Sequence, residues 1–121
     1  DYNSRIDTAG ASGGAYMVLE DNAVNDYVEY AVEVSQSGTY KVEIGYNKGS
    51  SRGIWQLAVD GSSQGSTIDA YSSSFSYAVA NLGNVTFSSS GNKLFRFKVT
   101  GKNASSSGYK IGIDYIKLIQ Q

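Results

Sequence analysis

The sequence has 121 residues, with 10 basic and 11 acidic side chains and a net charge of −1. This length favours a single domain over residues 1–121 with one core, and the near balance of charge argues against a protein that binds nucleic acid by neutralising phosphates. Cysteine and histidine are both absent, which excludes a disulfide framework, a thiolate metal site and a Ser-His-Asp triad.

Apolar runs are short throughout the sequence. None reaches the roughly 18 residues that a transmembrane helix needs, and the first residues lack the pattern of a signal peptide. We therefore expect a mature or excised segment without a membrane partner. Ten tyrosines accompany four phenylalanines and one tryptophan, and such rings with a polar tip suit half-exposed surfaces.

The N-terminal third changes character along its length. Residues 1–14 show no sustained periodicity and predict a loop or an irregular edge segment, and residues 15–19 predict a short strand. The stretch 27–46 then alternates apolar and polar side chains in two runs around a Ser-Gln-Ser-Gly turn. Alternation with period two places every other side chain on one face of a strand. We expect an antiparallel hairpin whose apolar face a second sheet covers.

The remaining strands are predicted from the same alternation at 53–60, 75–87, 93–100 and 109–119. Trp55 lies on the apolar face of the first of these and is predicted to be a core residue. The long strand 75–87 is expected to contain a bulge near Leu82, where the alternation slips. In the last strand Tyr115 is expected to point inward, with a phase change following it toward Ile116.

Short strands separated by glycine-containing turns predict an all-β fold, an antiparallel β-sandwich of the jelly-roll type. Each strand of such a fold carries the chain from one end of the sandwich to the other. Four longer polar loops are therefore expected to gather at one end, at residues 20–26, 47–52, 69–74 and 101–108. Tight turns are expected at the opposite end, at residues 35–38, 60–64 and 88–91. Long loops gathered at one end are typical of a binding face, although loop lengths also drift without any function.

Enzyme classes find little support in the composition. A hydrolase with paired carboxylates needs no histidine or cysteine and stays open. The acidic residues are scattered, however, and Glu29, Glu33 and Glu43 fall on outward strand faces, where a solvated charge is the ordinary state. We expect no catalytic residues.

The loop end contains the side chains that bind sugars. A sugar ring offers an apolar face and a rim of hydroxyl groups, and is bound by an aromatic ring together with planar polar groups. The predicted carbohydrate-binding residues are Tyr71, Phe75, Asp69, Arg52, Lys102, Asn103 and Tyr16. Two alternatives stay open: Tyr71 stacks on a ligand or packs within its loop, and Arg52 and Asn103 contact a ligand or tie the loops together through backbone carbonyls.

Three segments carry a family resemblance. DYVEYAVEVSQSGTYKVEIGY, the strand ending in VDG, and the terminal GIDYIKL resemble the non-catalytic carbohydrate-binding modules of families 6 and 35, over residues 12–119. Those modules are calcium-binding β-jelly rolls appended to secreted bacterial glycoside hydrolases and polysaccharide lyases. The resemblance implies a secreted module that binds a polysaccharide and accompanies a catalytic domain.

The resemblance also assigns positions. It places the second binding-site aromatic at Phe75, with Tyr71 as a neighbour able to replace it, and the first nearest to Tyr16. Gly112 stands where the family often has an asparagine.

For the structural calcium, the resemblance implies Asp114 as a ligand. The acidic first strand of the family has no counterpart in the opening DYNSRID, so we expect that first strand to be missing, and Asp1, Asp7 or backbone carbonyls would complete the site.

A second function class competes with sugar binding. A structural or interaction module, acting as a spacer or in an adhesin-like role, would use the same sandwich without a glycan. No exposed tryptophan is predicted, and glycine stands at position 112; both features favour that alternative.

Overall fold

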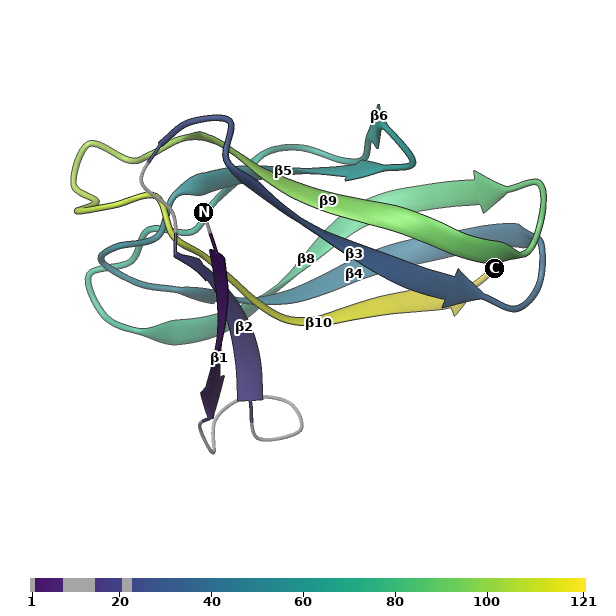
Figure 1. The fold of residues 1–121 in the computed structure, drawn as a ribbon, viewed down its shortest axis with the longest axis horizontal. Coiled ribbons are helices and arrows are strands. Elements are labelled where there is room, and N and C mark those ends of the chain that lie inside the picture. The colour runs from purple at the N-terminus through teal and green to yellow at the C-terminus, as the bar shows by residue number, and fades with distance from the viewer. Residues whose placement is uncertain (1, 8–14, 21–22) are drawn as a thin grey trace.

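The computed structural model describes the backbone of residues 2–7, 15–20 and 23–121, and the side chains of residues 23–121. Two antiparallel sheets pack face to face (Figure 1). Sheet A contains, in spatial order, β1 (Tyr2–Asp7), β2 (Ala15–Glu20), β10 (Ile111–Gln120), β4 (Gly38–Lys48) and β8 (Ser76–Phe87). Sheet B contains β3 (Tyr27–Val34), β9 (Gly91–Gly101), β5 (Ile54–Val59) and β6 (Ser62–Ser63), and β7 (Ile68–Asp69) also pairs with β5. The predicted β-sandwich is confirmed. In the part of the chain that the structure describes, no helix has the length and apolar character needed to span a bilayer.

The core lies between the sheets and follows the alternation of their strands. Every second residue is buried from Tyr40 to Tyr46 of β4 and from Phe95 to Val99 of β9, because those positions face the opposite sheet. Trp55 of β5 is fully buried, as predicted. Its ring meets Tyr46 at 5.5 Å and Phe97 at 5.3 Å between centroids, both edge-on, an arrangement that aromatic rings prefer.

The predicted hairpin over residues 27–46 is wrong. Strand β3 pairs with β9 in sheet B, whereas β4 pairs with β10 and β8 in sheet A. The turn between β3 and β4 therefore crosses from one sheet to the other. Alternation indicates which face of a strand is apolar, and the apolar face of β3 and that of β4 both pack toward the core. It does not indicate which strand is the hydrogen-bonding partner.

The expectation of an irregular N-terminus without a first strand is also wrong for residues 2–7. They form β1, which pairs with β2 from Tyr2↔Glu20 to Asp7↔Ala15. The segment has no apolar alternation because an edge strand can be held by backbone hydrogen bonds to its neighbour. Figure 1 shows the β1–β2 pair projecting from the side of the sandwich next to β10. The remaining residues of the predicted loop lie outside the described part of the chain.

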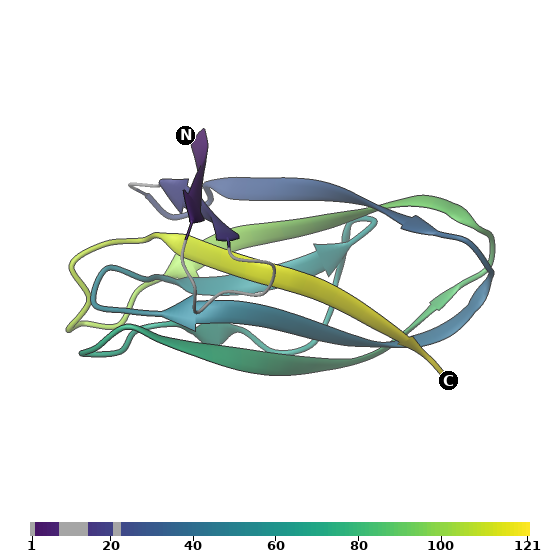
Figure 2. The ribbon, with the colours of Figure 1, turned by 90° about the horizontal axis from the view of Figure 1, so that it is seen from below.

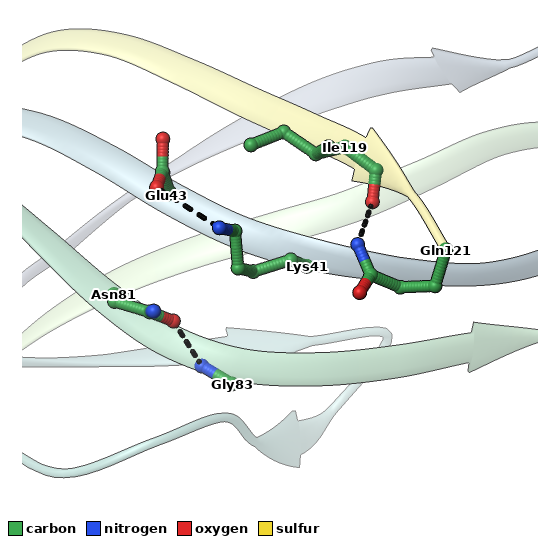
Figure 3. Close-up of polar contacts among 6 residues, drawn as sticks. All are labelled: Lys41, Glu43, Asn81, Gly83, Ile119 and Gln121. Atoms are coloured by element: carbon green, nitrogen blue, oxygen red, sulfur yellow. Dashed lines mark hydrogen bonds and ion pairs between the residues drawn. The ribbon is translucent and has the colours of Figure 1, made fainter.

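The predicted bulge in β8 is confirmed. Between the pairs Lys41↔Asn84 and Glu43↔Asn81, two residues of β8 face one residue of β4. Gly83 has φ of 81°, a conformation that glycine adopts without steric cost. The side-chain oxygen of Asn81 accepts a hydrogen bond of 3.1 Å from the Gly83 N–H (Figure 3).

The phase change in β10 begins earlier than predicted. Its register to β4 shifts between Ile113 and Tyr115, which makes Asp114 the extra residue. Tyr115 consequently lies on the outer face of sheet A rather than inward. Its ring covers Gly45, where a Cβ atom would overlap the ring.

The connections separate into two ends as predicted. We define the loop end as residues 23–26, 48–53, 70–75 and 102–110, and the turn end as residues 35–37, 60–64 and 88–90. Figures 1 and 2 show these groups at opposite ends of the sandwich. At the turn end Asp60 and Gly61 have φ of 48° and 86°, which gives the tight turn that the sequence Asp-Gly predicts.

Candidate functional site

Three loops of the loop end, residues 48–53, 70–75 and 102–110, are bonded to one another. Ser106 is buried, and its hydroxyl lies 2.7 Å from the carbonyl oxygen of Arg52. The Ser107 N–H donates to the carbonyl of Ser50 at 2.8 Å. Gly49 forms a parallel β-bridge with Tyr71. Loops that are distant in sequence therefore form one connected surface.

Asp69 joins two of the predicted site residues. One carboxylate oxygen accepts a hydrogen bond of 3.0 Å from the Tyr71 N–H, and the other accepts one of 3.0 Å from the Asn103 side-chain amide. Asn103 thus bonds to the carboxylate of Asp69, whereas the open alternative for this residue was a tie through backbone carbonyls. Tyr71 is half-buried. We call Asp69, Tyr71 and Asn103 the carboxylate cluster.

Arg52 and Phe75 form a second group. Arg52 is only 7% exposed, and its Nε donates to Oδ1 of Asn47 at 2.7 Å. Its guanidinium carbon lies 5.8 Å from the centroid of the Phe75 ring. Phe75 is 50% exposed, and its ring meets that of Tyr77 edge-on, with 5.2 Å between the ring centroids. Packing by these two neighbours leaves half of an aromatic ring facing water at the loop end.

Lys102 and Tyr16 stand apart from both groups. The ammonium of Lys102 donates to the Ser106 carbonyl at 3.0 Å and lies 5.9 Å from the Tyr109 ring centroid, so it holds its own loop. Tyr16 belongs to β2, where its backbone pairs with Ile6. Its side chain lies outside the described part of the structure.

Sequence reasoning gave Asn47 no role beyond the loop end's supply of polar groups. Its side chain is fully buried, and a Cβ atom at Gly112 would overlap its amide. The Asn47 amide therefore fills the space above the glycine, the position where the family resemblance placed an asparagine. Within the described residues its Nδ2 has no hydrogen-bond partner. Pairing of β4 with β10 brings the two residues together, and nothing in the sequence signals that pairing.

The carboxylate cluster also affects the core beneath it. Burial raises the pKa of the Tyr46 hydroxyl above its usual value, and the negative charge of Asp69 raises it further. Both effects disfavour the ionised phenolate.

Among the described side chains, the expected calcium ligand Asp114 is not part of a metal-binding group. Asp114 lies at the bulge of β10 and is half-exposed. Among the residues whose side chains the structure describes, no group of three acidic, histidine or cysteine side chains could hold a metal ion. Asp1 and the side chain of Asp7 lie outside those residues. The described residues alone thus do not fit the six to eight oxygen ligands that calcium takes.

Comparison with known structures defines the class to which this fold belongs. A family 35 carbohydrate-binding module from Clostridium thermocellum is 22% identical, with a TM-score of 0.64, over 98% of this chain and 88% of that one. A family 36 module solved with calcium and xylotriose is 21% identical, with a TM-score of 0.61, over 98% and 88% of the two chains. The chain therefore has the same fold as these modules, a β-sandwich of two antiparallel sheets.

A more similar sequence occurs within a larger protein. The whole chain is 40% identical to a segment of a Paenibacillus xanthan lyase, with a TM-score of 0.94, and it spans 12% of that lyase chain. No protein-family model matches the chain, and no curated protein does.

Proposed function

We propose that the chain is a non-catalytic carbohydrate-binding module that holds an attached catalytic domain on a polysaccharide. The fold of its structural relatives supports this function, as does the 40% identity to a segment of a xanthan lyase. Relatives that act on polysaccharides also make a secreted, extracellular location part of the proposal. A spacer role without sugar binding is the alternative that the experiments below must exclude.

The observation that carries the proposal is the half-exposed ring of Phe75 at the loop end, held by a buried arginine. A rigid ring with one open face can stack on the C–H face of a sugar with little loss of side-chain freedom. Tyr71 is the second stacking candidate, and Tyr16 stays a predicted third.

Polar groups lie at the same end of the sandwich as that ring. Asp69, Asn103, Arg52 and Lys102 bring charges and amides to the same end of the sandwich. Their hydrogen bonds fix their positions, and Asp69, Asn103 and Lys102 keep further donor or acceptor capacity for sugar hydroxyl groups. We expect dissociation constants between about 1 mM and 1 μM, or roughly −4 to −8 kcal/mol.

Affinity electrophoresis against a panel of polysaccharides that includes xanthan tests the function. The protein should be retarded by at least one polysaccharide, and the double variant Tyr71→Ala/Phe75→Ala should not be. Absence of retardation across the panel would select the spacer alternative, especially if a protein partner co-purified. Release of reducing ends by the isolated protein would contradict the non-catalytic assignment.

Calcium binding is part of the proposal because a structural relative was solved with calcium. Asp114 is the proposed ligand in this chain. A chelator should lower the melting temperature of the wild type and leave that of Asp114→Asn unchanged. Equal melting temperatures of the wild type with calcium and with chelator would remove the metal from the proposal without affecting the sugar site.

A further inference from the structure

The outer face of sheet B contains a groove that the loop-end site does not use. Its volume is about 570 Å³, within the range of roughly 300–1,000 Å³ that ligand sites occupy. Strands β3, β9 and β5 lie side by side beneath it, with β6 beside the end of β5 (Figure 1). The groove is therefore built on paired strands.

The hollow comes from one small residue among longer ones. Ala58 of β5 pairs with Arg96 of β9 on one side and with Ser63 of β6 on the other. Arg96 pairs in turn with Glu29 of β3. Paired residues of an antiparallel sheet lie on the same face, so the four side chains form a row across the sheet whose lowest point is the methyl group of Ala58.

Arg96 is fixed in this row by two neighbours. Its Nε donates to a carboxylate oxygen of Glu29 at 3.0 Å. Its guanidinium carbon lies 4.1 Å from the ring centroid of Tyr27, a stacking distance. Within the described part of the chain, neither Nη group of Arg96 makes a hydrogen bond. An oriented guanidinium with two free donor groups is the arrangement that binds a carboxylate through two parallel hydrogen bonds.

A second cation adjoins the first. Lys98 is exposed, lines the groove and pairs with Gln56 of β5. The Gln56 amide nitrogen lies 3.0 Å from the Leu57 carbonyl and 3.1 Å from that of Gly65, so its oxygen is left as an acceptor. Lys98 makes no ion pair among the residues whose side chains are described. Glu29, Arg96 and Lys98 together give the groove one net positive charge.

Apolar surface borders these polar groups. Tyr27 is 49% exposed and Leu94 is 46% exposed on the same face. An acidic sugar has a carboxylate, hydroxyl groups and C–H faces. The groove offers an oriented guanidinium and an unpaired ammonium for the carboxylate, hydrogen-bonding groups for the hydroxyl groups, and exposed apolar side chains for the C–H faces.

We propose that the groove on sheet B is a second binding site, which takes an acidic oligosaccharide with one uronate carboxylate on the Nη groups of Arg96 and the ammonium of Lys98. The groove lies on the outer face of sheet B and uses none of the residues proposed for the loop end. The proposal therefore stands or falls independently of the loop-end site.

Calorimetric titration with tetragalacturonate and tetramannuronate tests this site. At least one should bind, and its carboxyl-reduced, neutral form should bind at least about tenfold more weakly, as loss of a charged hydrogen bond implies. Lys98→Ala removes one cation, and Ala58→Leu fills the hollow without a change of charge. Each should weaken binding about tenfold with an unchanged melting temperature.

Matched variants locate the site. Lys117→Ala removes an exposed lysine from sheet A and should change affinity by less than about twofold. The double variant Tyr71→Ala/Phe75→Ala should retain uronate binding. The proposal is overturned if neither oligosaccharide binds, if the neutral form binds equally well, or if polyglutamate competes as strongly as the sugar. It is also overturned if the groove variants bind like the wild type, or if the loop-end variant alone abolishes binding.

Discussion

Replacing Phe75 by alanine is the sharpest perturbation of the proposed loop-end site. An aromatic side chain buries roughly 150–250 Å² when fully covered, and half of the Phe75 side chain is exposed. A sugar that covers one ring face would remove about 50 Å² of that surface from water. At about 25 cal/mol per Å² this contributes about 1.3 kcal/mol, so Phe75→Ala should weaken polysaccharide binding about tenfold.

Affinity electrophoresis and calorimetry on the polysaccharide that the panel identifies would measure this loss. Val79→Ala is the matched control, because Val79 is 57% exposed in β8, the strand that follows Phe75, and carries no ring. Phe75→Tyr keeps the stacking surface and should bind within about twofold of the wild type. The reasoning is refuted if Phe75→Ala binds as tightly as Val79→Ala, or if Phe75→Tyr loses as much affinity as Phe75→Ala. Melting temperatures would confirm that every variant is folded.

Two further predictions concern stability. Gly45→Ala should lower the free energy of unfolding, measured by urea unfolding, by about 1–3 kcal/mol, because the added methyl group overlaps the Tyr115 ring. Gly101→Ala is the control: Gly101 lies in β9 with open space around it, so the free energy of unfolding should change by less than about 1 kcal/mol. Burial and then Asp69 raise the pKa of Tyr46 above 10.0, so its stabilisation is complete below about pH 10 and is lost as pH rises through the folded-state pKa. From about pH 9 to about pH 11, Tyr46→Phe should therefore lose less stability than the wild type by tryptophan fluorescence, and an equal or greater loss would contradict this cause.

The sequence predicts which face of a strand is buried and at which end of the sandwich a loop lies. It does not predict which strands pair. Alternation placed Trp55 in the core and predicted the strand that contains the Gly83 bulge, because burial follows the period of a single strand. The partner of each strand depends on the rest of the fold, so β3 and β4 were assigned to one hairpin although they belong to different sheets. β1 was missed because its sequence lacks the alternation that a half-buried strand displays.

Some contacts of the candidate sites are predictable from the sequence, and others depend on strand pairing. Parity of the strands predicted that the long loops meet, and the contact between Asp69 and Asn103 lies where two of them join. The overlap of the Asn47 amide with the space above Gly112 depends on the register of β4 against β10, which no local pattern encodes. Arg96 had no place in the sequence analysis, because a charged residue on an outward face is ordinarily solvated; its stacking on Tyr27 appears only when β3 pairs with β9.

The crossing of the chain between sheets at the turn after β3 has a consequence for how the protein folds. Among the described strands, the long ladders of both sheets join segments that are distant in sequence, and local pairing is confined to β1–β2 and the short strands next to β5. Neither layer can assemble before much of the chain has closed on itself, so the cost of loop closure precedes most of the gain from pairing. Refolding after dilution from urea should accordingly take about milliseconds to seconds, the range of β-sandwiches dominated by distant contacts.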